Sequence, residues 1–167
     1  VPKSDAPIYQ IKVTLMDTVP PIWRRIQVPA KITLRKLSHA LQIAMGWSGA
    51  HLYGFRSGRT EYGPQLGNGL DDVFYRIYDD AKAKLSRVMP RQGDSLVYTY
   101  DMGDNWRHRI RLEKVLPRTR GVGYPLCLDG ARACPPEDCG GTGGYEDLLA
   151  ILKDPKHSKR NEMKKWL

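Results

Sequence analysis

No continuous apolar run in the sequence is long enough to cross a membrane, and the first ten residues lack the pattern of a signal peptide. A membrane-spanning helix needs about 20 consecutive apolar residues. A signal peptide needs a basic start followed by an apolar segment. We therefore expect a soluble, cytoplasmic protein that has no membrane partner.

Cysteine is also scarce, because the chain has only Cys127, Cys134 and Cys139 in 167 residues. Secreted proteins that depend on disulfides have more cysteines in a chain of this size, usually in an even number. The three thiols are therefore expected to be reduced. They are either small buried apolar groups in an irregular loop or metal ligands.

Several catalytic signatures are missing as well. The sequence contains no H-E-x-x-H zinc motif, no nucleophile elbow and no dinucleotide-binding fingerprint. The glycine-rich stretch Gly140–Gly144 is not followed by the lysine that a phosphate-binding loop requires. A non-catalytic binding or adaptor module is therefore favoured over an enzyme.

Basic residues, in contrast, are abundant. Lysine and arginine number 27 against 18 aspartates and glutamates, which gives a net charge of +9. The cations gather in two blocks, residues 24–36 and 153–165. Such blocks either form a solvated surface or contact the phosphates of a nucleic acid. Nucleic acid, protein and a small ligand are all candidate partners.

Length and composition predict a single domain over residues 1–167, since about 100–200 residues usually form one domain and an apolar content of 41% fits a packed core. In the first half, Thr33 can cap a helix that Gly46 ends. The apolar pattern there predicts strand, strand, helix and strand, at Ile8–Met16, Ile22–Val28, Leu34–Met45 and His51–Ser57.

The second half contains the strongest hairpin. Residues 95–101 and the segment that begins at Trp106 alternate between apolar and polar side chains and are joined by a tight turn. Tyr145–Lys153 and Ser158–Leu167 are predicted helices, and the whole pattern indicates an α+β fold. Residues 58–89 have a weak pattern, with turn residues at 67–69 and an acidic pair at 71–72, and are expected to form an insertion or a lid.

Polar, ionisable and thiol side chains are concentrated in this hairpin and in the segment Ala133–Leu149. That segment combines two cysteines, two prolines, the acidic pair Glu137–Asp138 and four glycines. Prolines stiffen and glycines free the backbone at fixed points, so the segment is predicted to hold a shape and to bind a partner. Its acidic side chains favour a cation or a guanidinium group over a phosphate. The candidate binding residues are Arg24, His51, Tyr98, Tyr100, Asp101, Asp104, Trp106, His108, Glu137, Asp138 and Tyr145.

Three of these candidates also have a structural interpretation. Arg24 lies on the apolar side of its strand, where a guanidinium needs a carboxylate or several carbonyl groups. It is therefore either a structural ion-pair partner or a ligand contact. His51 and His108 lie on inward rows of their strands and are either ligands or core histidines satisfied by a neighbour.

Zinc is the one cofactor that the residues suggest. Cys127, Cys134 and Cys139 offer three soft ligands, and His108 or His51 could supply the fourth. The spacing differs from the C-x2-C pairs of zinc fingers. The enzymatic alternative is a metal-dependent hydrolase in which His108 works with a carboxylate of the hairpin or of the acidic pair.

The chain resembles the plasmid pRiA4b open-reading-frame-3-like family. The matching motifs, in chain order, are P-P-I-W-R-R-I at Pro20–Ile26, A-M-G-W at Ala44–Trp47 with H-L at His51–Leu52, Y-x-Y-D-x-G-D-x-W-x-H at Tyr98–His108, and Y-P-x-C-L-x-G-x-R-A-C-P-P-E-D-C-G-G with G-Y-E-x-L-L within Tyr124–Leu149. The resemblance implies an α+β domain with a β-grasp-like core. It also implies a link to mobile elements, and relatives are expected to continue into a further acidic segment.

Overall fold

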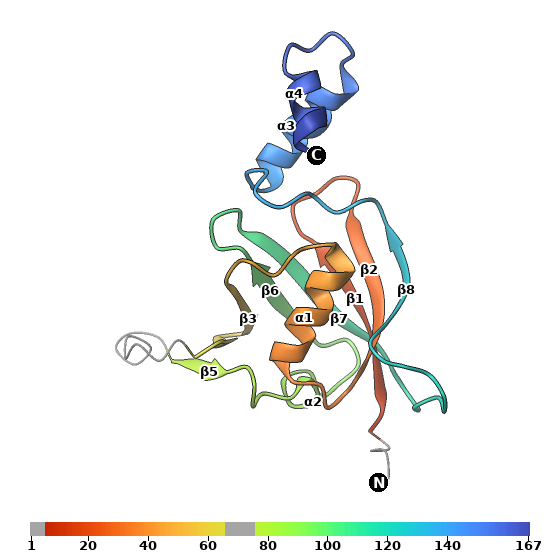
Figure 1. Ribbon diagram of the computed structural model, residues 1–167. Helices are drawn as coiled ribbons and strands as arrows, with labels where there is room; N and C mark the ends of the chain where they lie inside the picture. Colours follow the sequence, from red (N-terminus) through yellow and green to blue (C-terminus); the bar gives the residue numbers. More distant parts are fainter. Residues whose placement is uncertain (1–5, 66–75) are drawn as a thin grey trace.

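A mixed sheet of eight strands forms the framework of the protein, in the order β5-β4-β3-β6-β7-β1-β2-β8. The computed structural model describes residues 6–65 and 76–167. Helix α1 lies across one face of the sheet, and helices α3 and α4 stand together beyond one end of it (Figure 1). The strands are β1 Ile8–Leu15, β2 Ile22–Pro29, β3 Tyr53–Ser57, β4 Thr60–Gly63, β5 Ile77–Asp79, β6 Ser95–Tyr100, β7 Trp106–Leu116 and β8 Leu126–Ala131. The helices are α1 Leu34–Met45, α2 Leu85–Val88, α3 Gly141–Lys153 and α4 Arg160–Trp166.

The α+β prediction is confirmed, and the first four elements follow in the predicted order. The finer description, a β-grasp-like core, stays a prediction. Strands β4, β5 and β8 were not predicted. Strand β8 is exposed along nearly its whole length at the edge of the sheet, so it carries no alternation of buried and exposed positions.

The segment expected to be a lid contributes in part to the sheet. Strand β4 pairs with β3, and β5 pairs with β4 in the parallel sense. The predicted turn at 67–69 and the acidic pair at 71–72 lie outside the described residues. In the described parts of the chain, no helix combines the length and the apolar character that crossing a membrane requires.

Helix α1 forms where its sequence places caps at both ends. The Thr33 side chain accepts a hydrogen bond from the Lys36 amide at 3.3 Å, and Gly46 ends the helix with a left-handed φ of 79°. The buried face consists of apolar side chains at helical spacing, among them Leu34, Leu37 and Leu41. This face packs onto the inward side of the sheet and closes the main core.

An aromatic layer continues the core beyond the end of α1. The indole of Trp47 stacks on Tyr100 with ring centroids 4.9 Å apart and on Trp106 at 5.9 Å. It also meets the ring of His108 edge-on at 5.3 Å. Tyr98 lies under the same layer and shares hydrogen bonds with polar side chains of α1.

His108 is therefore a core residue, as the structural interpretation of the sequence proposed. Its side chain is fully buried, and Nδ1 lies 3.3 Å from the carbonyl oxygen of Tyr98. Within the described residues, Nε2 has no hydrogen-bond partner. Burial lowers the pKa of His108 from 6.5 to about 4, so the ring is neutral at physiological pH.

Arg24 joins β2 to the end of α1 and to the end of β8, and the oxygen atoms that it contacts belong to carbonyl groups rather than carboxylates. Its Nε donates to the Ala44 carbonyl at the end of α1 at 3.1 Å. Its Nη1 donates to the carbonyls of Trp23 at 2.8 Å and Ala131 at 3.2 Å. Gly130 allows this passage, because a Cβ there would lie 2.8 Å from the Arg24 Cδ. Arg24 thus has structural contacts, but they are made with carbonyl groups and not in the ion pair that was expected.

Replacing Arg24 with lysine is expected to lower the free energy of unfolding by about 2 kcal/mol. One ammonium group cannot reach all of these carbonyls. Chemical denaturation followed by tryptophan fluorescence measures the change. Arg109→Lys, on the exposed side of β7, is the matched control and should change the free energy by less than about 0.5 kcal/mol. Equal losses in the two variants would contradict the role given to Arg24.

The buried His108 predicts a loss of stability in mild acid. The unfolded chain binds the proton near pH 6.5 and the folded chain only near pH 4, so the unfolded state takes up more protons between these values. The contribution is complete above pH 6.5 and is lost as the pH falls toward 4. Between about pH 7 and about pH 5, we expect a loss on the order of 2 kcal/mol.

The pH dependence is tested by chemical denaturation of two variants at both pH values. His108→Gln, which has no group that titrates in this range, should lose much less stability on acidification than the natural chain. His39→Gln, at an exposed position of α1, should behave like the natural chain. An unchanged acid response in His108→Gln would show that other groups cause it.

Candidate functional site

Three segments that are far apart in the sequence meet at the end of the sheet nearest α3. They are the connection 46–52 after α1, the turn 101–105 between β6 and β7, and the loop 132–140 between β8 and α3, here called the cysteine loop. The polar residues where they meet are called the junction site: Ser48, His51, Tyr100, Asp101, Asp104, Glu137 and Asp138.

The β6–β7 turn is shaped by its own side chains. Asp101 and Asn105 have left-handed backbones, with φ of 58° and 56°, which these residue types tolerate better than most. The Asp101 Oδ1 accepts hydrogen bonds from the amides of Gly103 at 2.9 Å and Asp104 at 3.3 Å. This arrangement fixes the carboxylate and leaves its second oxygen facing His51.

Hydrogen bonds from Trp47, Ser48 and Tyr100 hold the cysteine loop against the core. The Trp47 Nε1 donates to the carbonyl of Pro135 at 2.9 Å. The Glu137 carboxylate accepts a hydrogen bond from the Ser48 amide at 2.9 Å and another from the Tyr100 hydroxyl. The predicted stiff loop therefore docks through its Pro-Pro and Glu-Asp pairs.

The glycines after Cys139 permit close backbone contact. A Cβ on Gly141 would lie 2.6 Å from the carbonyl oxygen of Asp104, and one on Gly144 would lie 1.9 Å from that of Cys139. The Gly140 amide donates to the Asp104 carboxylate at 3.2 Å. A carboxylate of the chain itself thus contacts the turn that opens α3.

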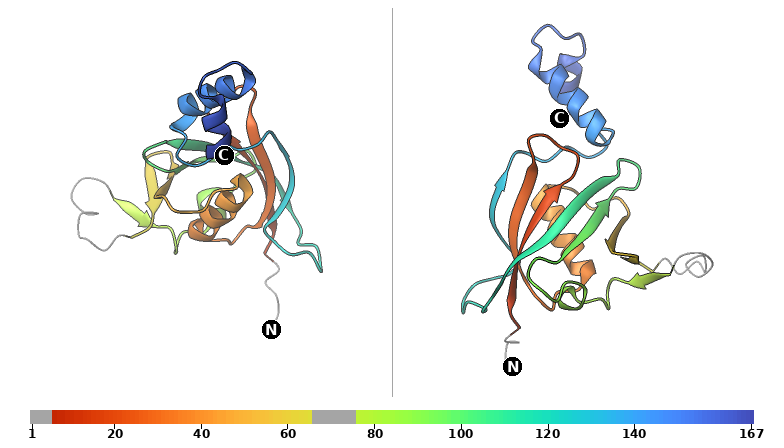
Figure 2. Two further views of the ribbon diagram at one scale, coloured as in Figure 1. Left: turned by 45° about the horizontal axis from the view of Figure 1, so that its top comes forward. Right: turned by 180° about the vertical axis from the view of Figure 1, so that it is seen from behind.

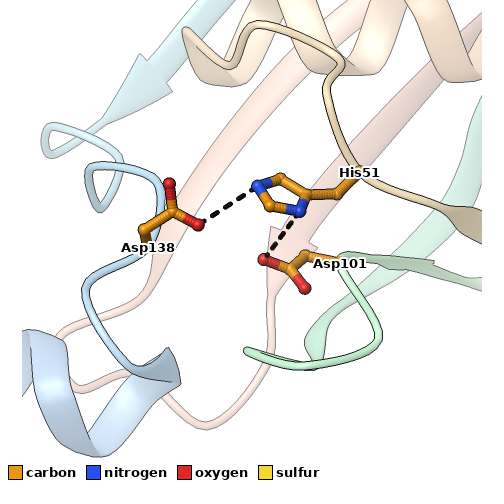
Figure 3. A group of neighbouring side chains, drawn as sticks. All are labelled: His51, Asp101 and Asp138. Atoms are coloured by element: carbon orange, nitrogen blue, oxygen red, sulfur yellow. Dashed lines mark ion pairs between the residues drawn. The ribbon is translucent and has the colours of Figure 1, made fainter.

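His51 lies between two carboxylates (Figure 3). Its Nδ1 is 3.6 Å from the Asp101 Oδ2, and its Nε2 is 3.2 Å from the Asp138 Oδ1. One ligand atom from each of the three residues lies within 4.8 Å of the other two, a spacing that a metal ion could bridge. The side chain of Asp101 is 11% exposed and that of Asp138 is 72% exposed, so the group opens to solvent on the side of the cysteine loop.

Hydrogen bonding and burial shift the pKa values of the surrounding groups. Burial alone would raise the pKa of Glu137, but the hydrogen bonds from Tyr100 and Ser48 outweigh it and lower this pKa. Burial and the contact with Glu137 raise the pKa of Tyr100 to about 12. Burial and the charges of Asp104 and Asp138 raise the pKa of Cys139 to about 11, so its thiol is protonated and unreactive at neutral pH.

The structure brings six of the predicted binding residues together and places the others elsewhere. The six are His51, Tyr100, Asp101, Asp104, Glu137 and Asp138. Tyr98, Trp106 and His108 are buried in the core. Tyr145, also buried, supports the cysteine loop from α3 through its hydroxyl, 3.4 Å from the Ala133 carbonyl.

The cysteines do not gather around a common centre. Cys127 is exposed on β8, and the Cys134 thiol packs 3.4 Å from the Met45 sulfur and 3.0 Å from the Arg24 Nη2. Cys139 lies against its own loop. Among the described residues, the group with a spacing that could hold an ion contains neither a cysteine nor His108. The geometry therefore does not support the predicted cysteine and His108 set.

Two residues of this region were not predicted. Trp47 holds the cysteine loop with its indole N–H, and Ser48 binds Glu137 through its backbone amide. Ser48 was not singled out because nothing in the local sequence pattern indicated that its amide and its side chain would face Glu137. Trp47 belongs to the A-M-G-W motif at Ala44–Trp47, and this motif could have identified it as a residue of the site.

Comparisons with known proteins give a consistent result. Residues 7–167 match the family model described as plasmid pRiA4b ORF-3-like protein. An uncharacterized protein of Sinorhizobium fredii, y4hQ, is 37% identical over 164 residues, which cover 96% of this chain and 81% of that protein. The crystal structure of MM3350, a protein of unknown function from Methanosarcina mazei Go1, is similar with a TM-score of 0.85 and 38% identity, covering 96% of this chain and 89% of that one. The chain therefore belongs to the plasmid pRiA4b ORF-3-like protein family.

Proposed function

We propose that this protein is a non-catalytic binding module and that its junction site binds a divalent transition-metal ion through His51, Asp101 and Asp138. The observation that carries the proposal is that one ligand atom from each of these three residues lies within 4.8 Å of the others. Bonds between metal and nitrogen or oxygen ligands are about 2.0–2.2 Å long, so small side-chain movements suffice for all three to reach one ion.

The donor set narrows the choice of ion. Imidazole nitrogen suits zinc, iron, nickel and copper, whereas carboxylate oxygen also suits manganese and magnesium. A set with one nitrogen and two oxygens therefore favours Zn²⁺ or Mn²⁺ over Ca²⁺. Three protein ligands leave at least one coordination position for water or for a donor from a partner. The exposure of Asp138 supports access for such a partner.

The local charge favours a cation in this place. The junction site contains four carboxylates, those of Asp101, Asp104, Glu137 and Asp138, and the imidazole of His51, although the whole chain carries +9. An anionic ligand would be repelled by this group. The guanidinium group of Arg24 donates its hydrogen bonds to carbonyl groups and not to these carboxylates.

The hydrolase alternative has less support than the binding module. It assigned acid–base chemistry to His108, which is fully buried and has a pKa lowered to about 4. A general base must lie within hydrogen-bond reach of the proton that it takes from the substrate. A partner that completes the coordination of the bound ion would instead give the protein an adaptor role.

Calorimetric titration of chelator-treated protein with Zn²⁺ and with Mn²⁺ tests the metal site. We expect one equivalent to bind. His51→Ala and Asp138→Asn should each weaken binding at least about tenfold, because each removes a ligand. Asparagine keeps the shape of Asp138 and tolerates its left-handed φ of 60°.

The controls separate this site from other metal-binding groups. His39→Ala and Glu146→Gln remove an exposed histidine and an exposed carboxylate outside the junction site and should leave the affinity unchanged. Cys127→Ser, Cys134→Ser and Cys139→Ser should also retain binding. Metal binding that survives in His51→Ala but is lost in the cysteine variants would overturn the assignment in favour of a thiolate site.

A further inference from the structure

The face of the sheet opposite α1 is not covered by any helix of the described chain. Seen from behind, strands β1, β6 and β7 face the viewer and α1 lies on their far side (Figure 2). We call this surface the open face and define it by eight outward side chains: Lys12, Thr14, Trp23, Arg25, Arg56, Arg107, Arg109 and Arg111.

Strand pairing arranges these side chains in rows across the sheet. One row runs through Arg25, Lys12 and Arg111 on β2, β1 and β7. The next row runs through Trp23, Thr14 and Arg109, and continues through Val97 to Arg56. Directly opposed residues in an antiparallel pair lie on the same face about 5 Å apart, so the cations form a continuous basic band.

The carboxylates near the band neutralise only part of it. Arg25 pairs with Glu113 at 2.7 Å and with Asp129 at 3.3 Å. Arg107 pairs with Asp17 at 2.7 Å. Arg109 and Arg111 are exposed and form no ion pair with any carboxylate in the described parts of the chain. Like charges in adjacent positions destabilise a sheet. The repulsion among the cations of the band therefore does not stabilise the fold.

An aromatic ring lies within the band. The indole of Trp23 is partly exposed, with the Lys12 Nζ 4.6 Å and the Arg25 guanidinium carbon 5.0 Å from its centroid. The sequence showed no interleaving of aromatic and basic residues that would suggest base stacking. Strand pairing creates it, because Trp23 and Lys12 come from different strands of one hairpin.

We propose that the open face binds single-stranded nucleic acid. Cations in rows can follow a phosphate backbone, while an exposed indole and arginine planes provide surfaces on which bases stack. A duplex keeps its bases stacked inside and presents grooves that a helix or a two-stranded ribbon enters. A broad sheet with a ring at its surface therefore suits unpaired bases better than a duplex.

A second basic region lies on the opposite side and serves as the internal comparison. A groove of about 1010 Å³ beside α1 is lined by Lys31, Arg35, Lys36, Lys84 and Arg118 together with apolar side chains. The Arg35 guanidinium is bound by the buried Asp80 carboxylate at 2.8 Å. Nucleic acid attracted by net charge alone would depend on this groove as much as on the open face.

Fluorescence anisotropy with a labelled oligothymidine of about 15 nucleotides tests the proposal. Binding is measured with a chelator present, so that metal at the junction site takes no part. Arg109→Ala/Arg111→Ala should weaken binding at least about tenfold and should reduce the slope of log affinity against log salt concentration by about 1.4. Lys36→Ala/Lys84→Ala removes two cations from the groove and is the matched control, expected to weaken binding less than about twofold.

The stacking role is tested separately at Trp23. Trp23→Ala should weaken binding about tenfold without a change in the salt slope, and Trp23→Phe should recover most of the loss, because any aromatic ring can stack on a base. Thermal melting of each variant verifies that it is folded. Should Trp23→Ala fail to fold, Trp23→Phe together with the arginine pair still decides the proposal.

Several outcomes of these measurements would overturn the proposal. The proposal is overturned if no binding is detected, or if the groove variant loses as much affinity as the open-face variant. It is also overturned if a duplex of the same length binds as tightly and ignores Trp23, which would indicate contact with phosphates alone. Displacement of the oligonucleotide by an equal charge of polyglutamate would point to an acidic protein partner instead.

Discussion

The need to satisfy one charged side chain on an apolar face governs much of this structure. Arg24 points inward from β2 between Ile22 and Ile26, and it forms no ion pair with a carboxylate of the described residues. Its donors reach carbonyls on β2, at the end of α1 and at the end of β8, and one contacts the Cys134 thiol. Because these bonds hold β8 and the start of the cysteine loop against the core, they also determine where that loop returns toward the sheet. The acidic half of the junction site depends on this placement.

The hairpin and α1 were predictable because each has a buried and an exposed side. Alternation in β6 and β7, and helical spacing with caps in α1, report that difference directly. Strand β8 has no buried side, since it lies at the sheet edge, and its residues gave no periodic signal. Register-dependent features, such as the basic band, could not be read from single strands, because they arise only when β1, β2 and β7 are aligned.

The candidate site was half predictable for a similar reason. The carboxylates of the hairpin turn and of the cysteine loop were identified from their residue types, and they do converge. The histidine was not resolved, since both His51 and His108 lie on inward rows of the sequence pattern. The position of Trp47 distinguishes the two histidines. Its ring packs on His108 within the core, with the ring centroids 5.3 Å apart, whereas His51 lies at the rim, partly exposed beside Tyr100. Only tertiary packing contains that information.

A single hairpin supplies both of the proposed surfaces. The inward residue Tyr100 and the turn residue Asp101 contribute to the acidic junction site, while the outward residues Arg107, Arg109 and Arg111 build the basic band on the opposite face. Side-chain alternation thus places the inward and outward residues of this hairpin on opposite faces of the sheet. A chain with a net charge of +9 thus carries both the acidic junction site, proposed to bind a cation, and the basic band, proposed to bind nucleic acid.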